Sequence, residues 1–299
     1  MKVSLFRLLQ RIAIISVFFL HGMPVARADL SDSLALMEAQ SPIDIRSDST
    51  YYGNLPALDF DLSPDTALTV INNGSPGTES TIRANVSPGE GSLMLSGHRW
   101  DLAQFHFHTP SEHLINGHST PLEMHLVFTD SADNLLVVGR GVKQGLFKNH
   151  ALEPIFSELP QTTEETLHID HFNLNALLPG YLGSFRYSGS LTTPPFSEGV
   201  SWVELASPLY LSGSQIEAFE ALFPDGNTRE VQELNGRIVL TDVPLFVNPL
   251  GGTGAVEEMP VLGAATTVPE PQTYAMLLAG LSLMGLIFFR RRQALSLFA

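Results

Sequence analysis

Two short segments with histidines at alternate positions constrain this 299-residue chain more than any other feature. They run from Gln104 to His108 and from Glu123 to Phe128. Successive side chains of a β-strand point to opposite faces, so each segment would have one polar and one apolar face. The polar positions are Gln104, His106, His108, Glu123 and His125. The apolar positions are Phe105, Phe107, Met124, Leu126 and Phe128.

The connection between the two segments contains the turn-forming pairs Thr109-Pro110 and Asn116-Gly117. This favours antiparallel neighbours whose three imidazoles converge on one surface. Three histidines with one open position are the ligand set of a catalytic zinc site. Gln104 and Glu123 each stand two residues before a histidine, where they could supply the oxygen that fixes its tautomer. For any one histidine taken alone, an ordinary core or surface position is the alternative.

The same stretch resembles the α-class carbonic anhydrases in their bacterial form, and the resemblance extends over roughly residues 40 to 245. Its motifs follow in the order of that family. They are Gln40 to Ile45, Ile71 to Gly74, Gln104 to His108, Ser111 to His113, Glu123 to His125, Tyr187 to Pro195, and the spaced residues Asn227, Arg229, Gln232, Asn235 and Arg237.

The resemblance implies reversible hydration of CO₂ to bicarbonate and a proton, with Zn²⁺ held by His106, His108 and His125. It also implies that Thr192 and Glu112 orient the attacking hydroxide. Behind the metal it implies a supporting layer of Gln104, Glu123, His113 and Tyr187. The apolar pocket for CO₂ would be formed by Val127, Val137, Leu191, Val200 and Trp202.

The chain departs from the family pattern in three places. Residues 29 to 39 contain no Trp or Tyr where the family has an aromatic-rich segment, and the absence of cysteine excludes a disulfide. Ser75 follows Asn-Asn-Gly where the family places its proton-shuttle histidine. Ser80 is the alternative equivalent and is not a histidine either, while Glu79 has too low an ordinary pKa to shuttle protons at pH 7.

Two alternatives to this enzyme stay open at the level of sequence. One is a non-catalytic surface or matrix binding protein on the same fold, although such proteins usually lack a zinc ligand. The other is an esterase that uses the same zinc-bound hydroxide on a carbonyl group.

Short β-rich runs broken by turns predict one mainly-β (α+β) catalytic domain over residues 29–248. The family fold implied is a large twisted, mostly antiparallel sheet with peripheral helices. We expect a buried strand at 135–142 and helices at 150–158 and 213–223.

Both ends of the chain carry targeting signals. Residues 1–28 have a basic start, an apolar run and an A-x-A cleavage site, which together predict a signal peptide; a membrane anchor is the alternative. Residues 249–267 resemble a flexible linker. Residues 268–293 resemble a PEP-CTERM sorting tail, with Pro-Glu-Pro, an apolar run at 274–289 and an arginine cluster.

These signals predict export to the periplasm, cell surface or extracellular matrix of a Gram-negative bacterium. The tail implies an exosortase-type processing enzyme as partner, with the apolar run spanning the membrane before processing; a plain membrane anchor is the alternative. The chain has 16 Lys and Arg against 31 Asp and Glu, so we expect no nucleic-acid partner.

Overall fold

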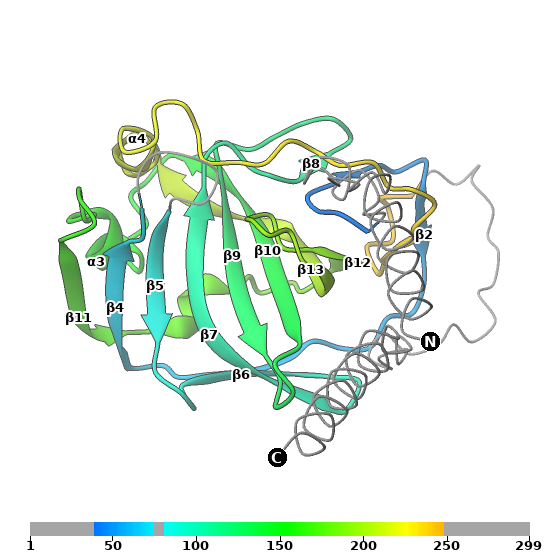
Figure 1. Ribbon diagram of the computed structural model, residues 1–299, viewed down its shortest axis with the longest axis horizontal. Coiled ribbons are helices and arrows are strands. Elements are labelled where there is room, and N and C mark those ends of the chain that lie inside the picture. The colour runs from blue at the N-terminus through cyan, green and yellow to red at the C-terminus, as the bar shows by residue number, and fades with distance from the viewer. Residues whose placement is uncertain (1–38, 75–80, 248–299) are drawn as a thin grey trace, which may run out of the picture.

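A twisted twelve-stranded sheet organises the computed structural model, which describes residues 39–74 and 81–247 (Figure 1). Its elements are β1 (Asp44–Ile45), β2 (Thr50–Tyr52), β3 (Asp59–Leu62), β4 (Thr66–Asn72), β5 (Ile82–Val86), β6 (Gly91–Leu95), β7 (His98–His108), β8 (Leu114–Ile115), β9 (Leu122–Thr129), β10 (Leu135–Gly145), α3 (Glu153–Phe156), β11 (Thr166–Phe172), the 3₁₀ helix η1 (Leu174–Leu177), β12 (Ser184–Ser190), β13 (Glu198–Ser212), α4 (Gly213–Glu220) and β14 (Val239–Thr241).

The strand order is β11-β4-β5-β7-β9-β10-β13-β12-β14-β2, with β3 and β6 attached beside β7. Most pairs are antiparallel; β10 with β13 and β14 with β2 are parallel, as is the separate pair of β1 with β8. The predicted fold class is therefore confirmed. The histidine strands β7 and β9 lie in the middle of the sheet, where neighbours on both sides hold their backbones (Figure 1).

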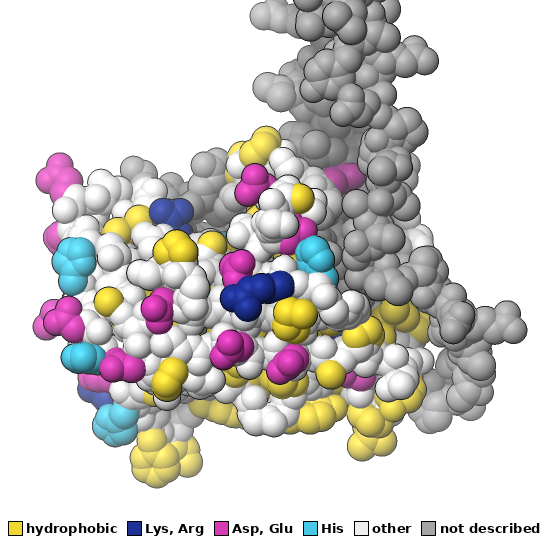
Figure 2. All heavy atoms as spheres, turned by 90° about the horizontal axis from the view of Figure 1, so that it is seen from below, with side chains coloured by type: hydrophobic (Ala, Val, Ile, Leu, Met, Phe, Trp, Pro, Cys, Tyr) yellow, Lys and Arg dark blue, Asp and Glu magenta, His cyan; other side chains and the backbone are white. Residues whose placement is uncertain are grey.

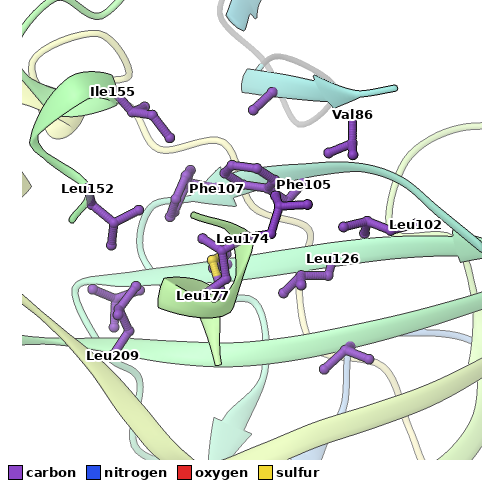
Figure 3. Packing of buried hydrophobic residues seen from close by; sticks show 14 of the residues in the cluster. Val86, Leu102, Phe105, Phe107, Leu126, Leu152, Ile155, Leu174, Leu177 and Leu209 are labelled. Carbon is purple, nitrogen blue, oxygen red and sulfur yellow. The ribbon is translucent and has the colours of Figure 1, made fainter. Parts of the chain in front are cut away.

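One face of β7 and β9 carries the main apolar core. Phe105 pairs with Leu126 and Phe107 with Met124 in the β7–β9 register, and all four side chains are almost fully buried. Figure 3 shows side chains from other elements, including Leu152 and Leu174, packed around this layer. The alternation of apolar and polar residues in the sequence thus directs one set of side chains into the core.

Both expected helices form, but each is shorter than predicted. Helix α3 covers only Glu153–Phe156, with Pro154 in its first turn, where a missing N–H is tolerated. Helix α4 begins at Gly213 with a capping box formed by Ser212 and Gln215 and ends at Glu220, shortly before Pro224.

Several sequence predictions fall on residues that the structure does not describe. These are the signal peptide, the linker, the sorting tail and the positions Ser75, Glu79 and Ser80. Within residues 39–74 and 81–247 no helix has the length and apolarity needed to cross a membrane.

Candidate active site

Three histidines come together on the face of the sheet opposite the main core. His106 and His108 lie on β7, and His125 of β9 is the direct cross-strand partner of His106. The ring centroids lie 5.0 Å apart for His106 and His108, 5.2 Å for His106 and His125, and 4.7 Å for His108 and His125. One nitrogen atom from each ring lies within 4.8 Å of the others, a spacing that could hold one metal ion.

Two of these rings are oriented by side chains of their own strands. The Nδ1 atom of His106 lies 2.8 Å from Oε1 of Gln104, and Nε2 of His125 lies 2.6 Å from Oε1 of Glu123. An acceptor at one nitrogen places the proton there and leaves the other nitrogen unprotonated. His106 therefore offers Nε2 and His125 offers Nδ1 to the space between the rings.

The third ring is oriented by a residue far away in the chain. Nδ1 of His108 lies 2.8 Å from the backbone carbonyl oxygen of Asn227, while the Asn227 side chain accepts from the Thr109 N–H and donates to the Phe107 carbonyl. Sequence reasoning noted Asn227 only as part of a spacing pattern. A backbone carbonyl leaves no side-chain signal, so this role could not be identified from the sequence.

The donor set fits a zinc ion. The Nε2 atom of His108 is buried and has no hydrogen-bond partner, which is costly unless a metal ion takes its lone pair. Burial lowers the pKa of all three histidines, that of His106 furthest, with the other two rings contributing there. The imidazoles are thus neutral at pH 7, which is the form that binds a metal.

A buried polar chain lies behind His125. Glu123 accepts from the His113 backbone N–H at 2.8 Å through Oε2, and its Oε1 atom lies 2.8 Å from Nδ1 of His113. Nε2 of His113 lies 2.7 Å from the Tyr187 hydroxyl, which donates to Oγ of Ser41 at 2.9 Å. Burial would raise the pKa of Glu123, but His113 and His125 lower it well below the usual range. Glu123 is therefore an anionic anchor.

Glu112 and Thr192 lie at the inner end of the site. Oε1 of Glu112 accepts from the Arg229 backbone N–H at 2.9 Å, while Oε2 lies 3.7 Å from Nε2 of His108 and 3.9 Å from Nδ1 of His125. Burial raises the pKa of Glu112 to about 7, whereas His125, the Arg229 N–H and the side chain of Thr192 each lower it. This carboxyl therefore lies next to Thr192 and to the nitrogen atoms that His108 and His125 direct into the space between the rings.

A cavity of about 290 Å³ opens onto the three histidines. Of the predicted pocket residues, those that line it are Val127, Val137, Leu191 and Trp202. Val200 does not line the cavity but packs behind it in a buried cluster with Trp202 and Tyr187. The same cavity has a polar side formed by Gln104, which the sequence predicted beside His106, and by Asn73, Thr81 and Arg83, to which the sequence analysis assigned no role. Alternation along β5 was the available signal for Arg83.

Comparisons with known proteins agree with this geometry. The family described as eukaryotic-type carbonic anhydrase matches residues 31–243, and the PEP-CTERM protein-sorting motif matches residues 267–292. A carbonic anhydrase of Pectobacterium carotovorum is 36% identical over 224 residues, which cover 74% of this chain and 88% of that protein.

Two further relatives extend the comparison. A carbonic anhydrase of Neisseria gonorrhoeae is 35% identical over 223 residues, covering 74% of this chain and 85% of that protein. The solved α-carbonic anhydrase of Thermovibrio ammonificans, in complex with the inhibitor sulfanilamide, is 35% identical with a TM-score of 0.64 and covers 71% of this chain and 94% of that one.

Proposed function

This chain belongs to the carbonic anhydrase family and catalyses the reversible hydration of CO₂, and from that premise we propose that His106, His108 and His125 hold the zinc ion. The single observation that carries the proposal is the set of three neutral imidazoles with their free nitrogens within 4.8 Å of one another. When bound there, Zn²⁺ would supply a nucleophile at neutral pH by lowering the pKa of a water molecule.

The residues around the three histidines fix where that nucleophile points. Gln104, Glu123 and the Asn227 carbonyl hold each ring in one tautomer. When Glu112 is ionised, it accepts a hydrogen bond from the Thr192 hydroxyl, so the Thr192 oxygen is left to accept a hydrogen bond from the attacking group. His113 and Tyr187 extend the support behind His125 and take no part in the chemistry.

The apolar side of the cavity suits CO₂. Val127, Val137, Leu191 and Trp202 give the substrate a dry surface beside the metal-binding nitrogens. A carbon atom held on this wall lies open to attack from the histidine side. The product carries a negative charge, which this apolar wall does not stabilise.

A CO₂-hydration assay on the purified protein, together with metal analysis, tests the proposal. We expect one zinc per chain and turnover that a sulfonamide inhibits. Turnover of an activated ester without CO₂ hydration would indicate the esterase instead. Stoichiometric zinc without either activity would indicate a surface or matrix binding protein, although retention of all three histidines argues against it.

For the ends of the chain we propose export, with a catalytic domain over 29–248 and a sorting tail over 268–293. The PEP-CTERM match at residues 267–292 supports recognition by an exosortase at the membrane and delivery to the cell exterior. Mass spectrometry of the native protein tests this, since processing removes the residues beyond about Pro271. An intact Arg290-Arg291-Arg292 would indicate a plain anchor.

A further inference from the structure

Arg83 lies beside the three histidines on the polar side of the cavity. On β5, Ile82, Ala84 and Val86 are buried in the main core, so Arg83 is on the opposite face of the sheet. Its cross-strand partner on β7 is His106, and direct partners in an antiparallel pair have Cβ atoms about 4.5–5.5 Å apart. The fold therefore places a permanent positive charge next to a metal-binding residue.

This charge is not compensated within the part of the chain that the structure describes. Arg83 forms none of the salt bridges there, and its Nε atom is buried without a hydrogen-bond partner. Arg140 provides the contrast, because its guanidinium donates to the carbonyl oxygens of Leu177, Ser207 and Pro208. An arginine with a purely structural role is expected to have such partners.

The surroundings make an unpaired cation at this place unusual. The chain has about twice as many acidic as basic residues, 31 against 16, and Figure 2 shows Asp and Glu spread over one face with few Lys and Arg. Arg83 nevertheless lines the cavity together with Asn73, Thr81 and Gln104.

We propose that Arg83 forms an oxyanion-binding subsite on the cavity wall, which holds bicarbonate beside the metal-binding histidines. Bicarbonate is planar with oxygens in the geometry of a carboxylate, and the guanidinium fork binds such groups through paired N–H donors. CO₂ has no charge for this fork to bind. The polar wall of the cavity thus distinguishes product from substrate. This inference rests on the proposed function.

The test measures inhibition of CO₂ hydration by bicarbonate and by nitrate, a planar oxyanion that does not react. In Arg83→Gln we expect both inhibition constants to rise about five- to tenfold, the effect of losing a charged hydrogen bond at a partly buried site. Arg83→Lys retains the charge without the fork and should recover part of the affinity. Arg99→Gln is the matched control, because Arg99 is exposed, pairs with Asp101 and lies outside the cavity.

The outcomes separate this inference from the proposed function. Unchanged inhibition constants in Arg83→Gln would contradict the subsite. An equal rise in Arg99→Gln would also contradict it, because it would show that only the net charge of the protein matters. The melting temperature of each variant shows whether its fold is disturbed. If a disturbed fold caused the loss of affinity, Arg83→Lys would lose as much affinity as Arg83→Gln. Absence of CO₂ hydration in the unchanged protein would instead contradict the proposed function.

Discussion

The two faces of strands β7 and β9 are made by alternating residues of the same segments, yet they are stabilised in different ways. On one face Phe105, Phe107 and Leu126 pack without any polar atom. On the other, His108 and His125 are just as buried, each about 1% exposed. The first face is stabilised by removal of apolar area from water, the second by specific hydrogen bonds.

The difference shows where function lies. On the polar face most buried nitrogen and oxygen atoms have a defined partner. Among the described residues, the buried side-chain atoms without a hydrogen-bond partner are Nε of Arg83, Nε2 of His108, Oε2 of Glu112, Nη2 of Arg186 and Oε2 of Glu204. Two of these atoms, Nε2 of His108 and Oε2 of Glu112, lie 3.7 Å apart in the histidine group, where we propose the zinc site.

Of the changes considered for the two faces, removing one of the three histidines should have the largest effect on activity and zinc content. His125→Ala deletes a nitrogen donor and leaves two ligands, too few for a stable zinc site. We expect CO₂ hydration to fall to background and most of the zinc to be lost. Metal analysis and the hydration assay measure both, and stoichiometric zinc in this variant would contradict the assignment of the ligands.

A substitution on the apolar face should show the reverse pattern. Phe107→Ala leaves a cavity in the apolar core, at the β7 position between His106 and His108 in sequence, and should lower the free energy of unfolding by about 3–5 kcal/mol. Since no polar partner is lost, the folded fraction should keep its zinc. Chemical denaturation and metal analysis measure these, with Phe107→Leu as the milder control. Zinc loss in folded Phe107→Ala would show that the two faces are not independent.

The sequence alone predicted these two faces because their period of two is a local property of each strand. It predicted Gln104 and Glu123 beside the histidines for the same reason, since both lie two residues along the same face. It could not place the Asn227 carbonyl on His108, because that contact joins residues 119 positions apart through a backbone atom. It also missed Arg83, whose importance depends on the absence of partners, and only a three-dimensional structure reveals that absence.

Glu123→Gln should lower the affinity of the three histidines for zinc. The glutamate is an anion whose Oε1 lies beside both His125 and His113 and whose Oε2 accepts from the His113 N–H. An amide is neutral and has one acceptor oxygen, so its NH₂ group would face the His113 N–H or the two rings without an acceptor. Loss of such an outer partner typically lowers metal affinity about 10- to 100-fold. Competition with a chelator measures the zinc affinity. Gln104→Ala is the comparison variant, because Gln104 is a neutral partner of one ring only. Equal losses in the two variants would mean that the charge of Glu123 is unimportant.

A smaller effect is expected at the far end of the same chain of hydrogen bonds. Tyr187→Phe removes the partner of Nε2 of the buried His113, which should cost about 1–2 kcal/mol of stability. Burial raises the pKa of Tyr187 well above its usual value, so the hydroxyl is protonated at any working pH. Zinc affinity should change little, because Glu123 keeps its contacts with His113 and His125. Tyr51 is exposed, so Tyr51→Phe is the control. A loss of zinc affinity in Tyr187→Phe as large as in Glu123→Gln would contradict the expectation that the effect on zinc decreases with distance from the histidines.

The smallest effect is expected on kcat, through the transfer of a proton from the site to solvent at the cavity mouth. Of the described histidines, those lining the cavity are the three metal-binding residues, so none of them is free to shuttle. Ser75 occupies the family's shuttle position in sequence, and a serine cannot exchange protons near pH 7 as a histidine does. We therefore expect proton transfer to limit turnover, so that imidazole buffer raises kcat severalfold while kcat/KM for CO₂ changes little. Ser75→His should recover part of this increase without added buffer. A kcat that does not depend on buffer concentration, measured at low buffer, would show that another group carries the proton.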